Sequence, residues 1–361
     1  MQMVEESGFA AARSFESEAA RRRPEGAVRV AVWLLLCCAL VFAMVVIGGV
    51  TRLTHSGLSI TEWQPIVGVL PPMTDAQWNE IFAKYQATPE YRQMNRGMSL
   101  EAFKHIFWWE YVHRLLGRVV GAAFLLPLLW FVARRTIPPR LAPQLFGVFL
   151  LGALQGALGW YMVQSGLVDN PRVSHLRLTA HLGLAFLIFA ALFWTALSLL
   201  YPKNGIDAPK SVSLRRAAYL VAILVFIMAL SGGLVAGTRA GFAYNTFPLM
   251  NGHVIPPEIM MIDPWYLNFF NNMATVQFDH RVLALVLAGS IPLVWWKTRT
   301  SPGVGKRARI GANILFAMLA VQVALGICNL ILVVPLPLAA AHQAGALLVF
   351  AASLYLAHAS R

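Results

Sequence analysis

Eight long, almost uncharged apolar stretches constrain the fold of this chain more than any other feature. A helix that spans a bilayer needs about 20 such residues. Stretches of this length lie at approximately 30–50, 111–133, 143–163, 178–200, 217–236, 276–296, 310–333 and 338–358. The chain is 58% hydrophobic and 12% charged, too apolar for a soluble core of 361 residues. Because only helices satisfy backbone hydrogen bonds over such lengths in lipid, we expect an all-α integral membrane protein with eight transmembrane helices.

The net charge of +13 predicts membrane orientation and does not indicate nucleic acid as a partner. Short basic loops beside spans stay in the cytoplasm. The basic residues of one side are Arg21, Arg22, Arg23, Arg29, Arg134, Arg135, Arg140, Lys203, Lys210, Arg215, Arg216, Lys297, Arg299, Lys306, Arg307 and Arg309. Both termini are therefore expected in the cytoplasm, and loops 51–110 and 237–275 should form a cap on the outer side.

The first 27 residues are polar and lack the apolar core of a signal peptide, which predicts a cytoplasmic tail over 1–27. A bacterial inner (plasma) membrane is the favoured location. A mitochondrial inner membrane is less favoured, because acidic residues such as Glu5 and Glu16 are unusual in a presequence. The three cysteines, Cys37, Cys38 and Cys328, have no zinc or disulfide spacing and are interpreted as packing residues.

The chain contains an internal repeat. The repeated features are Gly48-Gly49 with Gly57 and Gly232-Gly233 with Gly241, His113-Arg114 and His280-Arg281, Gln155-x-x-Leu158-Gly159 and Gln322-x-x-Leu325-Gly326, and Ala180-His181 and Ala341-His342. Each half has four spans, so both halves have the same orientation, unlike an inverted transporter repeat. We expect two pseudo-symmetric four-helix bundles, at 28–200 and 217–361, joined by a cytoplasmic linker at 201–216.

Four histidines lie inside predicted spans, near the outer face: His113, His181, His280 and His342. Ionisable residues in a membrane are costly and usually functional. Two histidines from different helices of one bundle suit bis-histidine heme ligation, so each half is predicted to hold one heme. His175 competes with His181, but its repeat partner would be Leu336, whereas His181 pairs with His342.

The residues beside these histidines differ between the halves. Arg114 and Arg281 follow the ligand candidates, and each could pair with heme propionates or anchor the lipid interface. Glu110 precedes His113 by three residues and shares its helical face, while the equivalent residue before His280 is Gln277. This difference indicates chemistry in the first half and a resident electron-transfer heme in the second. The alternative is that Glu110 only pairs with Arg114.

These features together resemble the heme A synthase family over essentially the whole chain after residue 28. The motifs that carry the resemblance are Gly48-Gly49-Val50-Thr51-Arg52-Leu53-Thr54-His55-Ser56-Gly57-Leu58-Ser59, Trp63-Gln64-Pro65, Glu110-Tyr111-x-His113-Arg114, Ala180-His181, Phe278-Asp279-His280-Arg281 and Ala341-His342-Gln343. The first outer loop has no cysteine pair, which is similar to the proteobacterial and mitochondrial branch.

The resemblance implies oxidation of the methyl group at position 8 of heme O to the formyl group of heme A, through an alcohol, for terminal oxidases. It implies that His113 and His181 flank the substrate heme iron, and that Glu110 assists the oxidation. It further implies that His280 and His342 ligate the iron of a heme b. A redox cofactor is needed for such chemistry.

Two other functions and several partners stay open at this point. A di-heme b-type cytochrome would pass electrons without modifying heme, but the inner leaflet offers no histidine pair for a second heme near that face. A heme exporter would need polar residues at mid-depth, and the spans contain few. Membrane lipid and heme O are expected partners, and contact with heme O synthase or oxidase assembly factors, an unidentified electron donor or acceptor, and a homo-oligomer are open.

Overall fold

The computed structural model describes residues 25–63, 67–168, 170–202 and 212–361. The predicted tail up to residue 24, and 203–211 of the predicted linker, lie outside the described residues, as do Gln64 and Pro65. The long helices are α2 (Glu25–Leu53), α5 (Leu100–Ala133), α6 (Ala142–Leu167), α7 (His175–Leu200), α8 (Val212–Thr238), α10 (Met273–Thr300), α11 (Lys306–Ile331) and α12 (Leu336–Ala359). All eight are long and apolar enough to cross a membrane, as predicted. The described residues contain no strand, only an isolated bridge between Met250 and His253.

Local capping residues set where several helices begin. The second span was predicted to begin near residue 111, but α5 begins at Leu100 because the Ser99 hydroxyl accepts a hydrogen bond from the Ala102 amide. Helix α5 therefore extends about three turns beyond its apolar stretch. Ser174 caps α7 and Asn272 caps α10 in the same way. The apolar stretches predict the spans, whereas these polar capping residues determine where the helices begin at the cap end.

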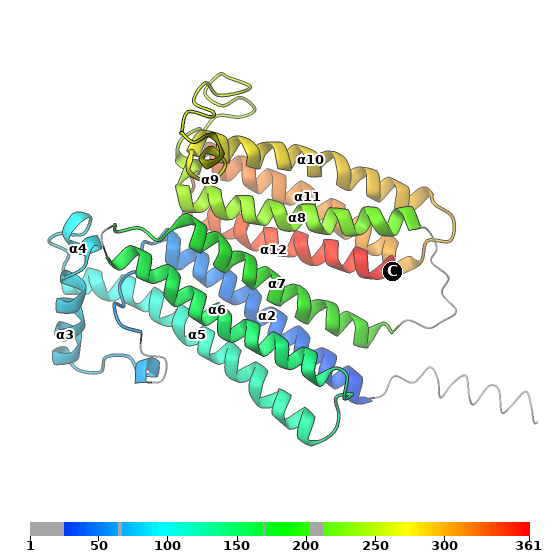
Figure 1. The fold of residues 1–361 in the computed structure, drawn as a ribbon, viewed down its shortest axis with the longest axis horizontal. Helices are drawn as coiled ribbons and strands as arrows, with labels where there is room; N and C mark the ends of the chain where they lie inside the picture. The colour runs from blue at the N-terminus through cyan, green and yellow to red at the C-terminus, as the bar shows by residue number, and fades with distance from the viewer. Residues whose placement is uncertain (1–24, 64–66, 169, 203–211) are drawn as a thin grey trace, which may run out of the picture.

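The eight long helices form two groups (Figure 1). In one group α2 packs on α5 and α7, and α6 packs on α7; in the other α8 packs on α10, and α11 packs on α10 and α12. Contacts of α7 with α8, and of α12 with α2 and α7, join the groups. This arrangement fits the predicted pair of four-helix bundles.

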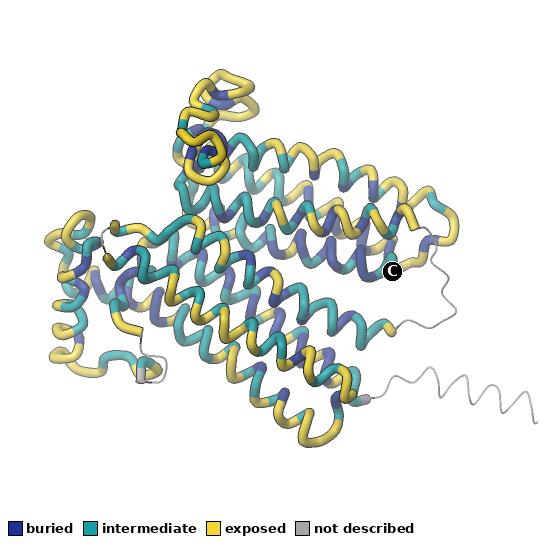
Figure 2. The backbone as a smooth tube through the Cα atoms, in the orientation of Figure 1, coloured by how far each residue is buried: buried dark blue, intermediate teal, exposed yellow. Residues whose placement is uncertain are grey.

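Burial divides the helices into an inner and an outer set (Figure 2). Leu34 of α2, Phe186 of α7, Ala218 of α8 and Leu356 of α12 are almost fully buried. Many large apolar side chains on the outer helices are exposed; those on α5 include Leu126, Leu129 and Trp130. Since apolar side chains facing outward suit lipid rather than water, the outer helices form the membrane-facing surface.

Both long loop regions lie at the same end of the helix groups (Figure 1). The first contains η1 (Val67–Val69), α3 (Asp75–Gln86) and α4 (Pro89–Gln93); the second contains η2 (Ala240–Phe242), η3 (Trp265–Leu267) and α9 (Asn268–Asn271). A buried aromatic cluster fastens the first region to the start of α5, and its members are Trp78, Tyr85, Phe103, Phe107 and Tyr111. This shared position fits the predicted cap.

Candidate functional site

Each of the four predicted ligand histidines packs against a glycine of a neighbouring helix. A Cβ atom added to Gly48 would lie 3.2 Å from the Nε2 of His113, and one added to Gly159 would lie 2.9 Å from the Cε1 of His181. In the second half, a Cβ on Gly232 would lie 3.4 Å from the Cε1 of His280, and one on Gly326 would lie 2.9 Å from the Cε1 of His342. The glycines leave room for the imidazoles, and they occupy equivalent positions in the two halves.

The structure brings the histidines together in the predicted pairs. His181 of α7 is close enough to His113 of α5 for a charge on one ring to act on the other. The same holds for His342 of α12 and His280 of α10. All four side chains are half-buried. Each pair therefore joins two different helices of one group.

Polar neighbours contact two of the four rings, and the Nε2 atoms of Gln155 and His181 lie 3.3 Å apart. The Gln155 amide donates to the backbone carbonyl of His181 at 3.0 Å, and Gln322 donates to that of His342 at 2.9 Å. The Oγ of Ser231 lies 3.2 Å from the Nδ1 of His280. A hydrogen bond at a ring nitrogen, as at His280, fixes the orientation of a metal-ligating histidine.

Several buried polar atoms at the histidine pairs have no hydrogen-bond partner within the described ranges. They are the Nδ1 atoms of His181 and His342 and the Oε1 atoms of Gln155 and Gln322. Buried polar atoms are usually bonded, so unsatisfied atoms at equivalent places in both halves indicate a bound group that is part of the native site. Outside the residue ranges left undescribed, no cluster of three or more histidine, cysteine or acidic side chains could hold a bare metal ion. Paired imidazoles beside glycines fit a heme.

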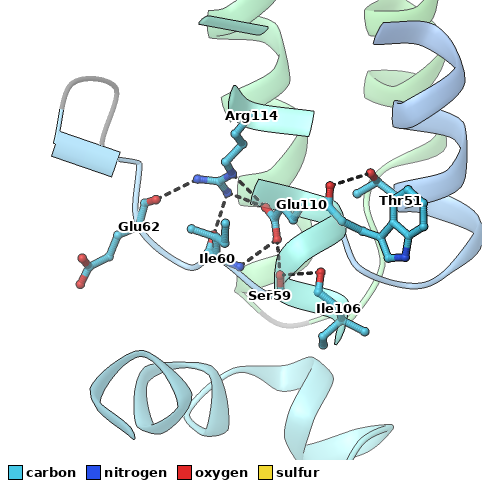
Figure 3. Close-up of polar contacts among 8 residues, drawn as sticks. Thr51, Ser59, Ile60, Glu62, Ile106, Glu110 and Arg114 are labelled. Atoms are coloured by element: carbon cyan, nitrogen blue, oxygen red, sulfur yellow. Dashed lines mark hydrogen bonds and ion pairs between the residues drawn. The ribbon is translucent and has the colours of Figure 1, made fainter. Parts of the chain in front are cut away.

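Glu110 lies in a closed polar network (Figure 3). The residue is 2% exposed, and its Oε1 accepts from the Nε and Nη2 of Arg114 at 3.0 and 2.6 Å. Its Oε2 accepts from the Ser59 hydroxyl at 2.7 Å and from the Ile60 amide at 2.8 Å. The ion pair considered as an alternative from the sequence is therefore present. Four donors stabilise a negative charge on this carboxylate and hold it in place.

Arg114 also fastens the first cap loop to α5. Its Nη2 donates to the carbonyl of Ile60 at 2.7 Å, and its Nη1 donates to that of Glu62 at 2.9 Å. Most of its N–H groups are thus bonded to protein acceptors. At most one N–H group of this side chain remains for a heme propionate, which was one of the two roles considered from the sequence.

Arg281 makes the equivalent contacts in the second half. Its Nη2 donates to the carbonyls of Tyr244 and Thr246 at 3.1 and 3.0 Å, and to the Oε1 of Gln277 at 3.1 Å. The Gln277 amide donates in turn to the carbonyl of Ala240 at 2.7 Å. The two halves therefore share an arginine clamp, and they differ in that a carboxylate in the first is an amide in the second.

His175 has different neighbours from His181. Its Nε2 lies 2.9 Å from the Oδ1 of Asn271 in α9, and a Cβ on Gly237 of α8 would lie 2.5 Å from the Cβ of His175. His175 thus contacts the second half of the chain, whereas His181 lies close enough to His113 for its charge to act there. These contacts favour His181 as the partner of His113.

Sequence reasoning assigned no role to several residues that build the site. Gln155 and Gly159 were visible in the repeat, together with their equivalents Gln322 and Gly326. A glutamine that recurs at the equivalent position of two apolar spans was a usable signal. Ser59 and Ser231 had no such signal, because their contacts depend on how distant helices and loops pack.

A model of the cytochrome oxidase assembly protein family, COX15-CtaA, matches residues 31–354. A relative from Nitrosospira multiformis named "Heme A synthase" is 61% identical over 333 residues, which cover 92% of this chain and 93% of the relative. Relatives of the same name from Nitrosomonas eutropha and Rhodospirillum centenum are 54% and 52% identical, over 90% and 88% of this chain and 92% and 84% of their own lengths.

The family match begins within α2, ends near the end of α12, and includes both histidine pairs. The first half and the second half are both included, so the repeated histidine–glycine contacts lie within the matched region. The chain therefore belongs to the COX15-CtaA family of cytochrome oxidase assembly proteins.

Proposed function

We propose that this multi-pass membrane protein is an oxidoreductase that converts heme O to heme A, acting on the methyl group at position 8. The relatives named for this activity match both halves of the chain over most of their lengths. Within the molecule, the proposal rests on the two pairs of half-buried histidines, because each histidine packs against a glycine of a neighbouring helix.

The substrate heme O is assigned to the first half, between His113 and His181. Written with water as the oxygen source, the methyl group and one water give the alcohol, and the alcohol and a second water give a geminal diol that loses water to form the formyl group. Each oxidation releases two protons and two electrons, and the electrons pass to an acceptor outside the chain. His113 and His181 position the substrate. We expect the outer cap, which the buried aromatic cluster fastens to the start of α5, to keep the site away from bulk water.

The second half is assigned to a resident heme b, held by His280 and His342. When bound, this group supplies one-electron transfer. The contact of Ser231 with the His280 ring supports this assignment, and Gln322 holds the backbone of α12 at His342. The second half has Gln277 at the position equivalent to Glu110, so this site lacks the carboxylate of the first half.

Glu110 is assigned an electrostatic role in the first half. Its four donors hold the carboxylate in one position beside Arg114. A fixed carboxylate three residues from His113 would stabilise positive charge that develops on the substrate during oxidation. Arg114 and Arg281 are assigned mainly to fastening the cap loops, with propionate pairing a lesser role.

The location proposed for the chain is a bacterial inner membrane with both termini in the cytoplasm, as the basic loops indicate. The cap would then lie on the outer side, near both heme sites. A heme O synthase is proposed as the supplier of substrate.

The division of labour is tested by comparing His113→Ala with His280→Ala in the purified full chain. We expect His280→Ala to lose the reduced-minus-oxidised absorbance of heme b. His113→Ala should keep that absorbance and lose product. Loss of the resident heme b from His113→Ala, but not from His280→Ala, would reverse the assignment of the two halves.

A further inference from the structure

Side chains from the two halves meet at the cap ends of α2 and α8. The Arg52 Nη1 donates to the carbonyl of Ala236 at 3.0 Å, and the Arg239 Nη2 lies 3.3 Å from the Nδ1 of His55. Residues 52 and 236, like 55 and 239, are 184 positions apart. That separation is also the one between Gly48 and Gly232. Equivalent positions of the repeat therefore contact each other here.

This cluster has positive charge without a matching negative charge. Arg172, an exposed residue before α7, lies within electrostatic range of both His55 and Arg239. Within the described ranges, no carboxylate forms an ion pair with Arg52, Arg172 or Arg239. Half-buried charges that lack a partner are unfavourable, so the cluster is suited to an anion from outside the chain.

The protonation of His55 adds another donor to the cluster. A guanidinium can only donate hydrogen bonds, so the Nδ1 of His55 must accept from Arg239, and its proton lies on Nε2. Burial and the nearby arginines lower the pKa of His55, which agrees with a neutral imidazole. The Nε2–H of His55 and the other N–H groups of Arg52 and Arg239 have no protein acceptor in the part of the chain that the structure describes.

The cluster lies close to both histidine pairs. Arg52 follows Gly48, the glycine against which His113 packs, by one helical turn, a rise of about 6 Å. Arg239 lies just past the end of α8, the helix whose Gly232 packs against His280. By contrast, most N–H groups of Arg114 are bonded to the protein.

We propose that Arg52, His55 and Arg239 form an anion subsite between the two halves that binds the propionate carboxylates of a heme. Arg172 lies at its rim. Charge-assisted hydrogen bonds from guanidinium to carboxylate are among the strongest in proteins. The inference rests on the proposed function, because it assumes that a heme occupies at least one of the two histidine pairs.

The test measures how much the carboxylates of a heme contribute to its binding. The full chain, purified in detergent from heme-limited cells, is titrated with ferric heme b and with its dimethyl ester, which has no propionate charge. The Kd of each probe is read from the heme absorbance. The wild-type chain should bind the free acid at least roughly tenfold more tightly than the ester, since hydrogen bonds to charged groups are among the stronger ones.

The double variant Arg52→Gln with Arg239→Gln should lose this preference. Arg52→Lys retains the charge and should keep part of it, which separates the electrostatic effect from any loss of folding. Arg140→Gln is the matched control, because Arg140 is exposed and lies in the loop between α5 and α6, away from the cap. Its preference for the free acid should equal that of the wild type.

Two outcomes would overturn the proposal while leaving the proposed function intact. In the first, the double variant binds heme b and keeps the full preference for the free acid. In the second, native mass spectrometry finds phosphatidylglycerol on the wild type and not on the double variant while the preference is unchanged, which assigns the cluster to a lipid phosphate. A wild-type chain that binds neither probe would instead contradict the proposed function, and this inference with it.

Discussion

Glu90 of α4 is a buried acid that should make the outer cap less stable as the pH rises. The side chain is 3% exposed, and the Tyr85 hydroxyl donates to its Oε2 at 3.2 Å. Burial raises the pKa of Glu90 from about 4.5 to about 7, and the charge of Glu110 acts in the same direction. The neutral acid is therefore the form that suits the folded cap near neutral pH.

The sign and size of the effect follow from proton linkage. Between pH 4.5 and 7 the folded state binds a proton at Glu90 that the unfolded state has released, so stability falls as the pH rises through this range. The stabilising contribution is complete below pH 4.5 and is lost above pH 7. A pKa difference of about 2.5 corresponds to about 3 kcal/mol of unfolding free energy.

Glu90→Gln keeps the shape of the side chain and an acceptor for Tyr85, but removes the titration. The variant should be more stable than the wild type by up to about 3 kcal/mol at pH 8 and similar to it near pH 4.5. Thermal unfolding in detergent at several pH values, read as variant minus wild type, measures the difference. Glu101→Gln is the control, since Glu101 is exposed and pairs with Lys104 at 2.7 Å. A difference that does not change with pH, or a Glu90→Gln variant that is less stable at pH 8, would refute the reasoning.

Three further predictions concern the site and its supports. Glu110→Gln should lower the yield of heme A by roughly tenfold or more, as expected for loss of about 1.4 kcal/mol of transition-state stabilisation, while bound heme is retained; an unchanged yield would exclude the electrostatic role. Gly326→Ala should reduce heme b content, because the new methyl group would lie 2.9 Å from His342, whereas Gly147→Ala, with no atom within 4 Å, should leave the heme spectrum unchanged. Arg281→Gln should speed amide hydrogen exchange in residues 244–249, because the loop carbonyls lose their donor; exchange equal to that of the wild type would show that the clamp contributes little.

The spans and the histidine pairs were predictable from the sequence because both depend on local or repeated patterns. Apolar runs of sufficient length specify helices in lipid, and His181 was preferred over His175 by its repeat partner alone. The contacts of His175 with Asn271 and of His181 with Gln155 give that preference a physical basis. The start of α5 at Leu100 was missed, because a capping serine and an aromatic cluster extend the helix beyond its apolar stretch.

Contacts between distant segments could not be predicted in this way. Ser59 and Ile60 reach Glu110 only because the first cap loop folds back onto α5. Arg52 and Arg239 meet only because α2 and α8 end side by side, although each lies near a repeated glycine pair. The repeat predicts which positions are equivalent, but not which of them touch.

The most direct test of the account is to co-express the chain with a source of heme O in cells that lack heme A. The noncovalent hemes are then extracted and identified by chromatography and mass. We predict heme A, or its alcohol intermediate, in the extract. Bound heme b together with unaltered heme O, from a well-folded sample supplied with reductant and oxygen, would contradict the account and indicate an electron-transfer cytochrome.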